Sequence, residues 1–195
     1  MWKEFIEQEY LKACNSTIDK PTNDIKEHLP TLYNLGMECD RITEMGSRWG
    51  ASSRAFLKTN AKFTAYDLEL HPPLIEIFNK AKESGKDVEY IEADVLKTNI
   101  DYTDLLFIDT WHTNPQLRQE LAMHGNKSQK YLVFHDTHTF GVRNEVPRWW
   151  ETPNHKAEPG QGLLPAIIDF IIDNPHWKFK EHRTNCNGLT ILERI

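Results

Sequence analysis

Two short groups of acidic and imidazole side chains follow continuous apolar runs of this sequence. Asp109 and His112 follow one run in "LLFIDTWH", and His135, Asp136 and His138 follow another in "YLVFHDTHTFG". Carboxylates and imidazoles held together bind a divalent cation, or they supply a general base that removes a proton from a substrate. A single histidine is most often structural, but two such groups at neighbouring strand ends favour a reactive site.

The segment "RITEMGSRWGASSRAFL" places an acid and two glycines between a strand-like run and the start of a helix. Glu44, Gly46 and Gly50 form the pattern E-x-G-x-x-x-G. A tight turn needs one glycine, so the second predicts a backbone that passes close to a ligand. The pattern lacks the first glycine of the dinucleotide fingerprint, and no phosphate-binding lysine follows it, which excludes a P-loop.

Two further acids stand at the ends of predicted strands. Asp67 ends "KFTAYDL", where a carboxylate is placed to accept hydrogen bonds from both hydroxyls of a ribose. Asp94 in "IEADV" is placed to bond the amino group of an adenine. With the glycine pattern, Asp67 favours an adenosine-containing ligand, although each acid also suits a helix N-cap or a turn.

The composition is that of one folded domain. The chain has 195 residues, of which 39% are hydrophobic and 11% aromatic. Its formal net charge of −6 argues against a broad surface for nucleic acid or an anionic membrane. The three cysteines are widely spaced and odd in number, which predicts reduced thiols and a cytoplasmic location rather than a disulfide framework.

Neither a signal peptide nor a membrane span is expected. The N-terminal "MWKEFIEQEYLK" has acids where a signal peptide has its apolar run. The longest apolar run, "GLLPAIIDFII", contains Pro165 and Asp169 and falls short of the roughly 20 residues of a spanning helix.

Strand-like and helix-like segments alternate after residue 40. Apolar strands are predicted over 41–45, 62–68, 88–95, 103–111 and 130–137. Helices are predicted over 52–58, 72–85, 115–125 and 162–174. This order implies a parallel sheet covered by helices on both faces.

The last two predicted strands, 177–184 and 188–195, are separated only by "NCN". That connection is too short for a crossover, so the pair is expected to be antiparallel. We therefore predict an α/β fold: a single doubly wound, Rossmann-like domain with a mostly parallel seven-stranded sheet and a C-terminal antiparallel hairpin.

Residues 1–40 form a predicted N-terminal helical segment that acts as a lid over a ligand or as a contact in a homodimer. In "NDIKEHLPTLYNLGMEC" the helix begins either after an N-cap at Asn23 or Asp24, or at Pro30.

Aromatic residues gather in the predicted loops after the fourth and fifth strands. Trp111, Phe140, Trp149 and Trp150 either line a pocket or cover the core. The segment 144–162, "NEVPRWWETPNHKAEPGQG", is long and rich in proline and glycine, which is typical of a lid or a substrate loop.

The motifs together resemble a known family. "ITEMGSRWGASSRAFL", "AYDL", "LLFIDTWHT", "YLVFHDTHTFG" and "NCNGLTILERI" are similar to segments of class I S-adenosylmethionine (SAM)-dependent methyltransferases, in the group of cephalosporin hydroxylases and rhamnosyl O-methyltransferases. The resemblance covers residues 24–195 and implies a SAM-binding methyltransferase domain over 41–195. It implies a cofactor site made of Glu44, Gly46, Ser47, Gly50, Asp67, Leu68, Asp94 and Asp109.

The resemblance also implies a magnesium ion held by acids that follow the fourth and fifth strands. Asp109 and Asp136 match that pattern, but His135 stands where a further acid is expected. Histidine is a poorer magnesium ligand than a carboxylate. Three alternatives stay open for the set Asp109, His135 and Asp136: no metal, a weakly held magnesium ion, or a softer divalent cation.

The function that this resemblance implies is SAM-dependent O-methylation of a small molecule with a sugar, polyol or aromatic hydroxyl. His112, His135 or His138 would remove the proton of that hydroxyl, since imidazole ordinarily titrates near neutral pH. Three other functions stay open: an NAD-dependent oxidoreductase, a metal-dependent hydrolase, and a SAM-binding protein without catalysis.

Overall fold

A seven-stranded sheet forms the centre of the computed structural model, which describes residues 1–15, 24–145 and 161–195. The strands are β1 (Arg41–Met45), β2 (Lys62–Asp67), β3 (Val88–Glu92), β4 (Thr103–Ile108), β5 (Ser128–His135), β6 (Trp177–Arg183) and β7 (Leu189–Arg194). Their order in the sheet is β3-β2-β1-β4-β5-β7-β6. The first five strands pair in parallel, and β7 pairs antiparallel with β5 and β6. The predicted fold class is confirmed.

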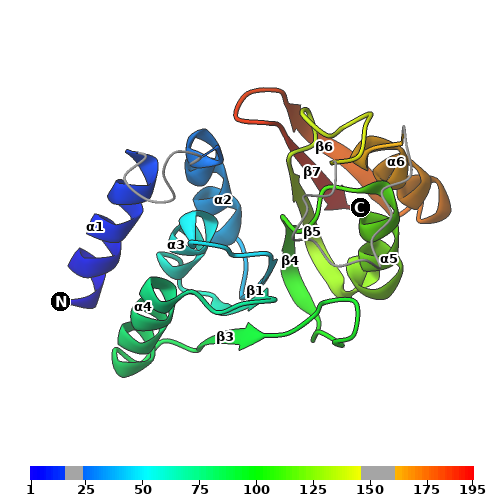
Figure 1. Cartoon of the computed structure of the whole chain (residues 1–195). Helices are drawn as coiled ribbons and strands as arrows, with labels where there is room; N and C mark the ends of the chain where they lie inside the picture. The colour runs from blue at the N-terminus through cyan, green and yellow to red at the C-terminus, as the bar shows by residue number, and fades with distance from the viewer. Residues whose placement is uncertain (16–23, 146–160) are drawn as a thin grey trace.

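Helices cover both faces of this sheet (Figure 1). They are α1 (Trp2–Cys14), α2 (Leu29–Gly36), α3 (Ala51–Leu57), α4 (Pro72–Glu83), α5 (Asn114–His124) and α6 (Leu163–Asp173), with short 3-10 turns η1 (Lys26–His28) and η2 (Gly125–Lys127). Within the described ranges, no helix has both the length and the apolar character needed to cross a bilayer.

Alternate residues of β4 pack into two separate cores. Leu105 and Phe107 join the cluster covered by α1, α2, α3 and α4, whereas Leu106 and Ile108 join the cluster covered by α5 and α6. Successive side chains of a strand point to opposite faces, so a continuous apolar run requires both faces to be covered. The apolar run of the fourth predicted strand is explained in this way.

Some element boundaries differ from the prediction. The helix expected to begin at Ser52 begins at Ala51, after an N-cap at Gly50. Of the two helix starts predicted after residue 23, the later one is nearer to the structure: a 3-10 turn precedes α2, which begins at Leu29 and has Pro30 in its first turn. Proline is tolerated there because the first N–H groups of a helix have no partner within it. The turn has Ile25 at its N-cap, so Asp24 is not a cap, and Asn23 lies outside the described residues.

The N-terminal helix α1 packs against α3. Ile6, Tyr10 and Ala13 of α1 are buried in the same cluster as Phe56 of α3. The described part of segment 1–40 therefore shares a core with the rest of the chain. Its roles as a lid or a dimer contact stay predictions.

The turn after β1 passes very close to the end of β4. Gly46 has a φ of +82°, and a Cβ on it would lie 2.1 Å from the carbonyl oxygen of Asp109. The Asp109 N–H donates to the carbonyl of Met45 at 2.9 Å, so these two strand ends are also hydrogen bonded. Glycine is required at position 46 because of both its backbone angle and this contact.

The substitution Gly46→Ala is expected to lower the free energy of unfolding by more than about 3 kcal/mol, because main-chain atoms of Asp109 would have to move. Gly85→Ala is a matched control, since Gly85 has a φ of +86° but nothing within 4 Å of an added Cβ. It should cost only about 1 kcal/mol of backbone strain. Urea denaturation of both variants measures the difference, and equal losses would contradict the role of the contact with Asp109.

Candidate active site

The carboxyl ends of the parallel strands meet at one edge of the sheet, and the strand order reverses there between β1 and β4. Ligands of open α/β sheets bind at such a reversal. Asp67 is the last residue of β2, Asp109 follows β4, and Asp136 follows β5, so the fold brings these predicted site residues to one edge.

Residues 46–50, which we call the glycine loop, connect β1 to α3. Gly46, Arg48 and Gly50 have positive φ values of 82°, 45° and 77°. A Cβ added to Gly50 would lie 2.5 Å from Cδ1 of Leu74, and a Cβ added to Gly46 would lie 2.1 Å from the carbonyl oxygen of Asp109. The positive φ values and these contacts favour glycine at both positions, and the close approach of a ligand to them stays a prediction.

The Asp67 carboxylate holds the glycine loop at the end of β2. Its Oδ2 accepts hydrogen bonds from the N–H groups of Ser47 at 2.8 Å and Arg48 at 2.7 Å, and from the Ser47 hydroxyl at 3.1 Å. Its Oδ1 accepts only a long bond of 3.4 Å, from the Glu69 N–H, among the described residues. Oδ2 therefore organises the loop, whereas Oδ1 has only this long hydrogen bond among the described residues.

Apolar side chains flank the glycine loop at the surface. The Trp49 ring lies over the His71 ring with centroids 4.7 Å apart, and Leu68 is 73% exposed. The Tyr90 hydroxyl accepts from the His71 N–H at 3.2 Å and contacts the Ser47 hydroxyl at 3.3 Å. These contacts join the loop to the segment after β2.

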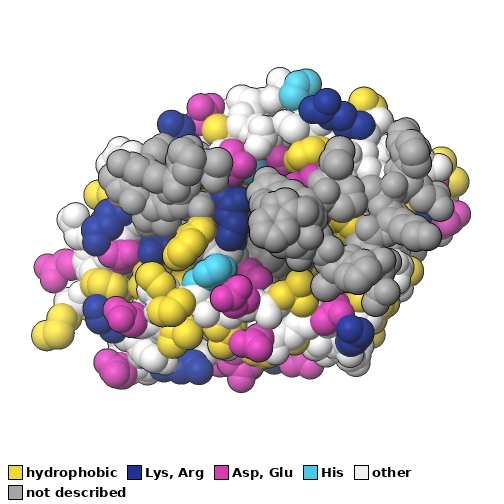
Figure 2. All heavy atoms as spheres, in the orientation of Figure 1, with side chains coloured by type: hydrophobic (Ala, Val, Ile, Leu, Met, Phe, Trp, Pro, Cys, Tyr) yellow, Lys and Arg dark blue, Asp and Glu magenta, His cyan; other side chains and the backbone are white. Residues whose placement is uncertain are grey.

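The face drawn in Figure 2 mixes basic and acidic side chains among its described residues, without an extended patch of one sign. The expectation that the chain has no nucleic-acid partner stays a prediction.

Glu44 is fully buried at the end of β1. Its two carboxylate oxygens accept hydrogen bonds from the hydroxyls of Ser52 and Ser53 in α3, each at 2.5 Å. Burial raises its pKa to about 8, against the opposing effect of the two serines. The geometry gives Glu44 the task of joining β1 to α3, and a contact with a cofactor stays a prediction.

Asp94 lies beyond the end of β3 and is half-buried. It accepts a hydrogen bond from the Leu96 N–H at 2.9 Å and pairs with Lys97 at 2.8 Å. These bonds are typical of a turn acid. The predicted contact with an adenine stays a prediction.

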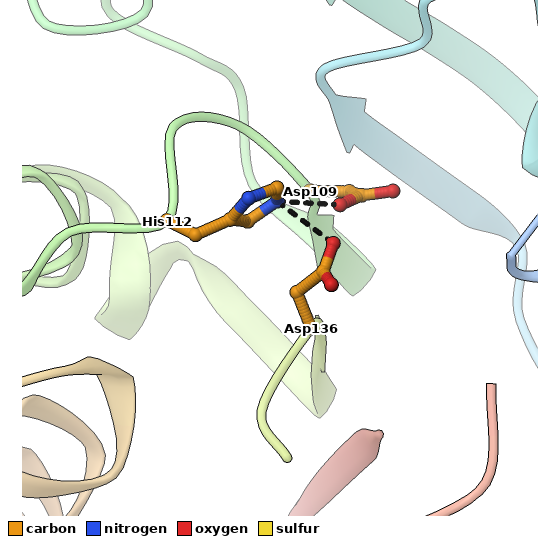
Figure 3. A group of neighbouring side chains, drawn as sticks. All are labelled: Asp109, His112 and Asp136. Atoms are coloured by element: carbon orange, nitrogen blue, oxygen red, sulfur yellow. Dashed lines mark hydrogen bonds and ion pairs between the residues drawn. The ribbon is translucent and has the colours of Figure 1, made fainter. Parts of the chain in front are cut away.

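Asp109, His112 and Asp136 point toward one another (Figure 3). Nε2 of His112 lies 3.2 Å from Oδ1 of Asp109 and 3.0 Å from Oδ2 of Asp136. Nδ1 of His112 lies 2.9 Å from Oε2 of Glu145, and the imidazole stacks on the Phe140 ring at 5.0 Å. Carboxylates on both ring nitrogens fix the orientation of this imidazole.

His135 joins the same cluster from the end of β5, where its side chain is 1% exposed. Its Nδ1 lies 3.3 Å from Oδ1 of Asp109 and 3.2 Å from Oδ2 of Asp136. Its Nε2 lies 3.0 Å from the carbonyl oxygen of Cys186, to which it donates. We call Asp109, His112, His135 and Asp136 the four-residue cluster.

Electrostatics within the four-residue cluster differ from the sequence expectation. Burial acts to raise the pKa of Asp109, but the charges of His135 and His112 and their hydrogen bonds hold it below its usual range. Burial acts to lower the pKa of His112, but hydrogen bonds to Asp109 and Glu145 raise it to about 10. The pKa of His135 is also raised, mainly by Asp109. The carboxylates thus shift the pKa values of both imidazoles upward, whereas the sequence predicted titration near neutrality.

The donors of the cluster fit a divalent cation. Ligand atoms of Asp109, His112 and Asp136 all lie within 4.8 Å of one another. Oδ1 of Asp136 is buried and has no hydrogen-bond partner among the described residues. Glu145 on the far nitrogen of His112, and the Cys186 carbonyl on that of His135, are the supports that metal-binding histidines usually have.

Three residues beside the cluster were missed as site residues. Glu145 is hydrogen bonded to His112. Burial raises the pKa of Asp24, while the charge of His135 acts to lower it and that of Asp136 to raise it. Glu120 is fully buried and lines a cavity of about 10 Å³ with both imidazoles, which is room for one water molecule. An acid in a loop or on a helix carries no periodic signal that marks it as part of a site.

His138 is exposed and stands apart from the four-residue cluster. Its N–H donates to the carbonyl of Asn187 at 2.8 Å, and its imidazole makes no hydrogen bond to the cluster within the described ranges. The structure therefore brings His112 and His135 together, but not His138.

The long segment that begins at Asn144 has its two ends joined. Oδ1 of Asn144 accepts hydrogen bonds from the N–H groups of Asn114 at 2.8 Å and Gly162 at 3.0 Å. Trp149 and Trp150 lie outside the described residues, so their predicted places in a pocket wall stay predictions.

No protein-family model matches this chain, and no curated protein matches it. Solved structures do match it, methyltransferases among them. A Burkholderia thailandensis 1,6-didemethyltoxoflavin-N1-methyltransferase is 11% identical, with 97% of this chain and 87% of that chain covered and a TM-score of 0.60. A proposed caffeoyl-CoA O-methyltransferase from Staphylococcus aureus is 18% identical, with coverages of 87% and 83% and a TM-score of 0.58.

The third is a Podospora anserina methyltransferase bound to S-adenosylhomocysteine (SAH). It is 16% identical, covers 97% of this chain and 88% of its own, and has a TM-score of 0.57. At such identities the likeness establishes the fold, which is the one shared by these methyltransferases.

The substitution Glu44→Gln is expected to change how stability depends on pH. The pKa of Glu44 is about 8 in the folded chain and ordinarily 4.5, so the wild type should lose stability as pH rises from about 5 to about 8. The neutral glutamine lacks this loss, and the variant should gain more than about 1 kcal/mol relative to wild type over that range. Urea denaturation at pH 5, 6.5 and 8 measures it, with exposed Glu76→Gln as the control. Parallel curves for Glu44→Gln and wild type would contradict the assignment.

Proposed function

We propose that this chain is a SAM-dependent methyltransferase that methylates a hydroxyl group of a small molecule. The observation that carries the proposal is the contact between the glycine loop and the four-residue cluster. Gly46 lies against the main chain of Asp109, so a cofactor on the loop and an acceptor at the cluster would be neighbours. Methyl transfer requires this alignment more than any covalent help from the protein.

The residues around the glycine loop suit the adenosine part of SAM. Oδ1 of Asp67 would accept from the ribose hydroxyls, while Oδ2 keeps the loop in place through Ser47 and Arg48. Leu68, which is 73% exposed, supplies apolar surface for the adenine, and Asp94 an acceptor for its amino group. Bound SAM would supply an activated methyl group on its sulfonium.

The four-residue cluster would hold the acceptor. His112 and His135 are the candidates for moving its proton, and Trp111 and Phe140 for its apolar wall. The carboxylates around His112 and His135 favour the charged form of both imidazoles, so either one would first have to give its own proton to a neighbouring carboxylate before it could take the proton of the acceptor. A divalent cation held by Asp109, His112 and Asp136, with His135 beside it, would lower the pKa of a hydroxyl.

Mixed imidazole and carboxylate ligands suit manganese, iron, cobalt or zinc better than magnesium.

The Burkholderia thailandensis methyltransferase, which shares this fold, was solved with 1,6-didemethyltoxoflavin and SAH, and this supports a small organic acceptor. A contact between two copies of the chain through residues 1–40 remains part of the proposal.

Wild-type protein is expected to bind SAH with micromolar affinity in calorimetric titration. Asp67→Ala should weaken this affinity by about tenfold or more, because it removes charge-assisted hydrogen bonds to ribose and loop. Glu69→Gln is the matched control, an exposed acid two residues further on whose loss should leave affinity unchanged.

The same titrations separate the alternatives. Tight NAD binding without SAH binding would contradict the proposal and favour an oxidoreductase. SAH binding with no methyl loss over a panel of sugars, polyols and phenols would favour a SAM-binding protein without catalysis. Metal-stimulated ester or phosphodiester cleavage without SAM would favour a hydrolase.

Manganese is expected to raise the melting temperature of the wild type, because a cation that binds only the folded chain stabilises it. Asp136→Asn should reduce that rise by weakening manganese affinity about tenfold or more, and EDTA should abolish it. Asp169→Asn, at an exposed acid paired with Arg118 on the helices, is the control. An equal rise in Asp136→Asn and wild type, or none with manganese, cobalt, zinc or magnesium, would rule out the metal site.

A further inference from the structure

A buried ion pair joins α1 to α3 beneath the glycine loop. Nε of Arg54 lies 3.1 Å from Oε2 of Glu9, and the two side chains are only 5% and 10% exposed. Glu9 also pairs with Lys12 of its own helix at 2.5 Å. A buried guanidinium without a counter-charge is strongly unfavourable, so Glu9 determines where Arg54 is held.

The other end of the same guanidinium holds the glycine loop. Nη1 of Arg54 donates to the carbonyl of Trp49 at 2.8 Å and to that of Gly50 at 2.7 Å. These are the last two carbonyls of the loop before α3 begins. A planar guanidinium presents its donors in a rigid fork, so its orientation is passed to the groups it binds.

We propose that α1 braces the glycine loop: Glu9 holds Arg54 in the one orientation that fixes the carbonyls of Trp49 and Gly50. Glu9 and Arg54 are positioning residues, since both side chains are buried between α1 and α3 and act through the carbonyls of the loop. The inference rests on the proposed function, because it takes the glycine loop to be the SAM site. It gives segment 1–40 a task in cofactor affinity that differs from those of lid and dimer contact.

A second ion pair between the same two helices separates bracing from ordinary packing. Nζ of Lys58 lies 2.9 Å from Oε2 of Glu7, so Glu7 also links α1 to α3. Lys58 makes no hydrogen bond to residues 46–50 within the described ranges, and Glu7 is the more exposed of the two acids. Substitution of Glu7 thus removes only a contact between α1 and α3. Substitution of Glu9 removes such a contact and also the group that holds Arg54 against the glycine loop.

The experiment compares wild type, Glu9→Gln, Arg54→Lys and Glu7→Gln in the full chain. Hydrogen exchange by mass spectrometry follows peptides over residues 46–57 against peptides from β4 and β5, and calorimetry measures SAH affinity. Arg54→Lys keeps a positive charge beside Glu9 but has no fork for two carbonyls, so it serves even if Glu9→Gln fails to fold.

In Glu9→Gln and Arg54→Lys, exchange should be faster over residues 46–57 and unchanged in β4 and β5, and SAH affinity about tenfold weaker. Glu7→Gln should match wild type in both. The proposal would be contradicted if exchange rose equally across the chain. It would also be contradicted if exchange over residues 46–57 were the same in Arg54→Lys as in wild type. A wild type that binds no SAH would instead refute the proposed function, while exchange over residues 46–57 would still decide the brace.

Discussion

The close approach of β1 and β4 at the edge of the sheet is the constraint on which the candidate site depends. The Asp109 N–H bonds the Met45 carbonyl, and Gly46 leaves room for the Asp109 carbonyl oxygen. Main-chain atoms thus set the distance between the glycine loop and the four-residue cluster. Asp67 holds the loop from the neighbouring strand, so hydrogen bonds join both halves of the candidate site at one edge of the sheet.

The charges of the site behave as one unit rather than as separate groups. Asp109 and Asp136 each contact both His112 and His135, and Glu145 completes the set from outside. Removing any member leaves the others with an uncompensated charge in a largely buried place. Effects of single substitutions here are therefore not additive, and only combined variants apportion them.

The sequence predicted the fold and the strand-end acids because both depend on local patterns. Apolar runs gave the strands, and the short "NCN" connection gave the antiparallel hairpin. Asp109 and Asp136 followed from the rule that ligands bind beyond parallel strands. The partners contributed by loops and by α1, such as Glu145 and the Glu9–Arg54 pair, could not be predicted, since they depend on how distant segments dock. The high pKa of His112 depends in turn on how many of those partners surround it.

The amide of Asn144 has a consequence for how this chain can diversify. It joins the beginning of a long segment to Gly162 at its end, so the chain leaves and re-enters the scaffold at a single point. Lengthening a connection whose ends are already fixed has only a small entropic penalty. A change of chain length between Asn144 and Gly162 is therefore expected to leave β5 and α6 in place. An insertion point beside a candidate site is a place where one scaffold can acquire new substrates by a change in a single connection.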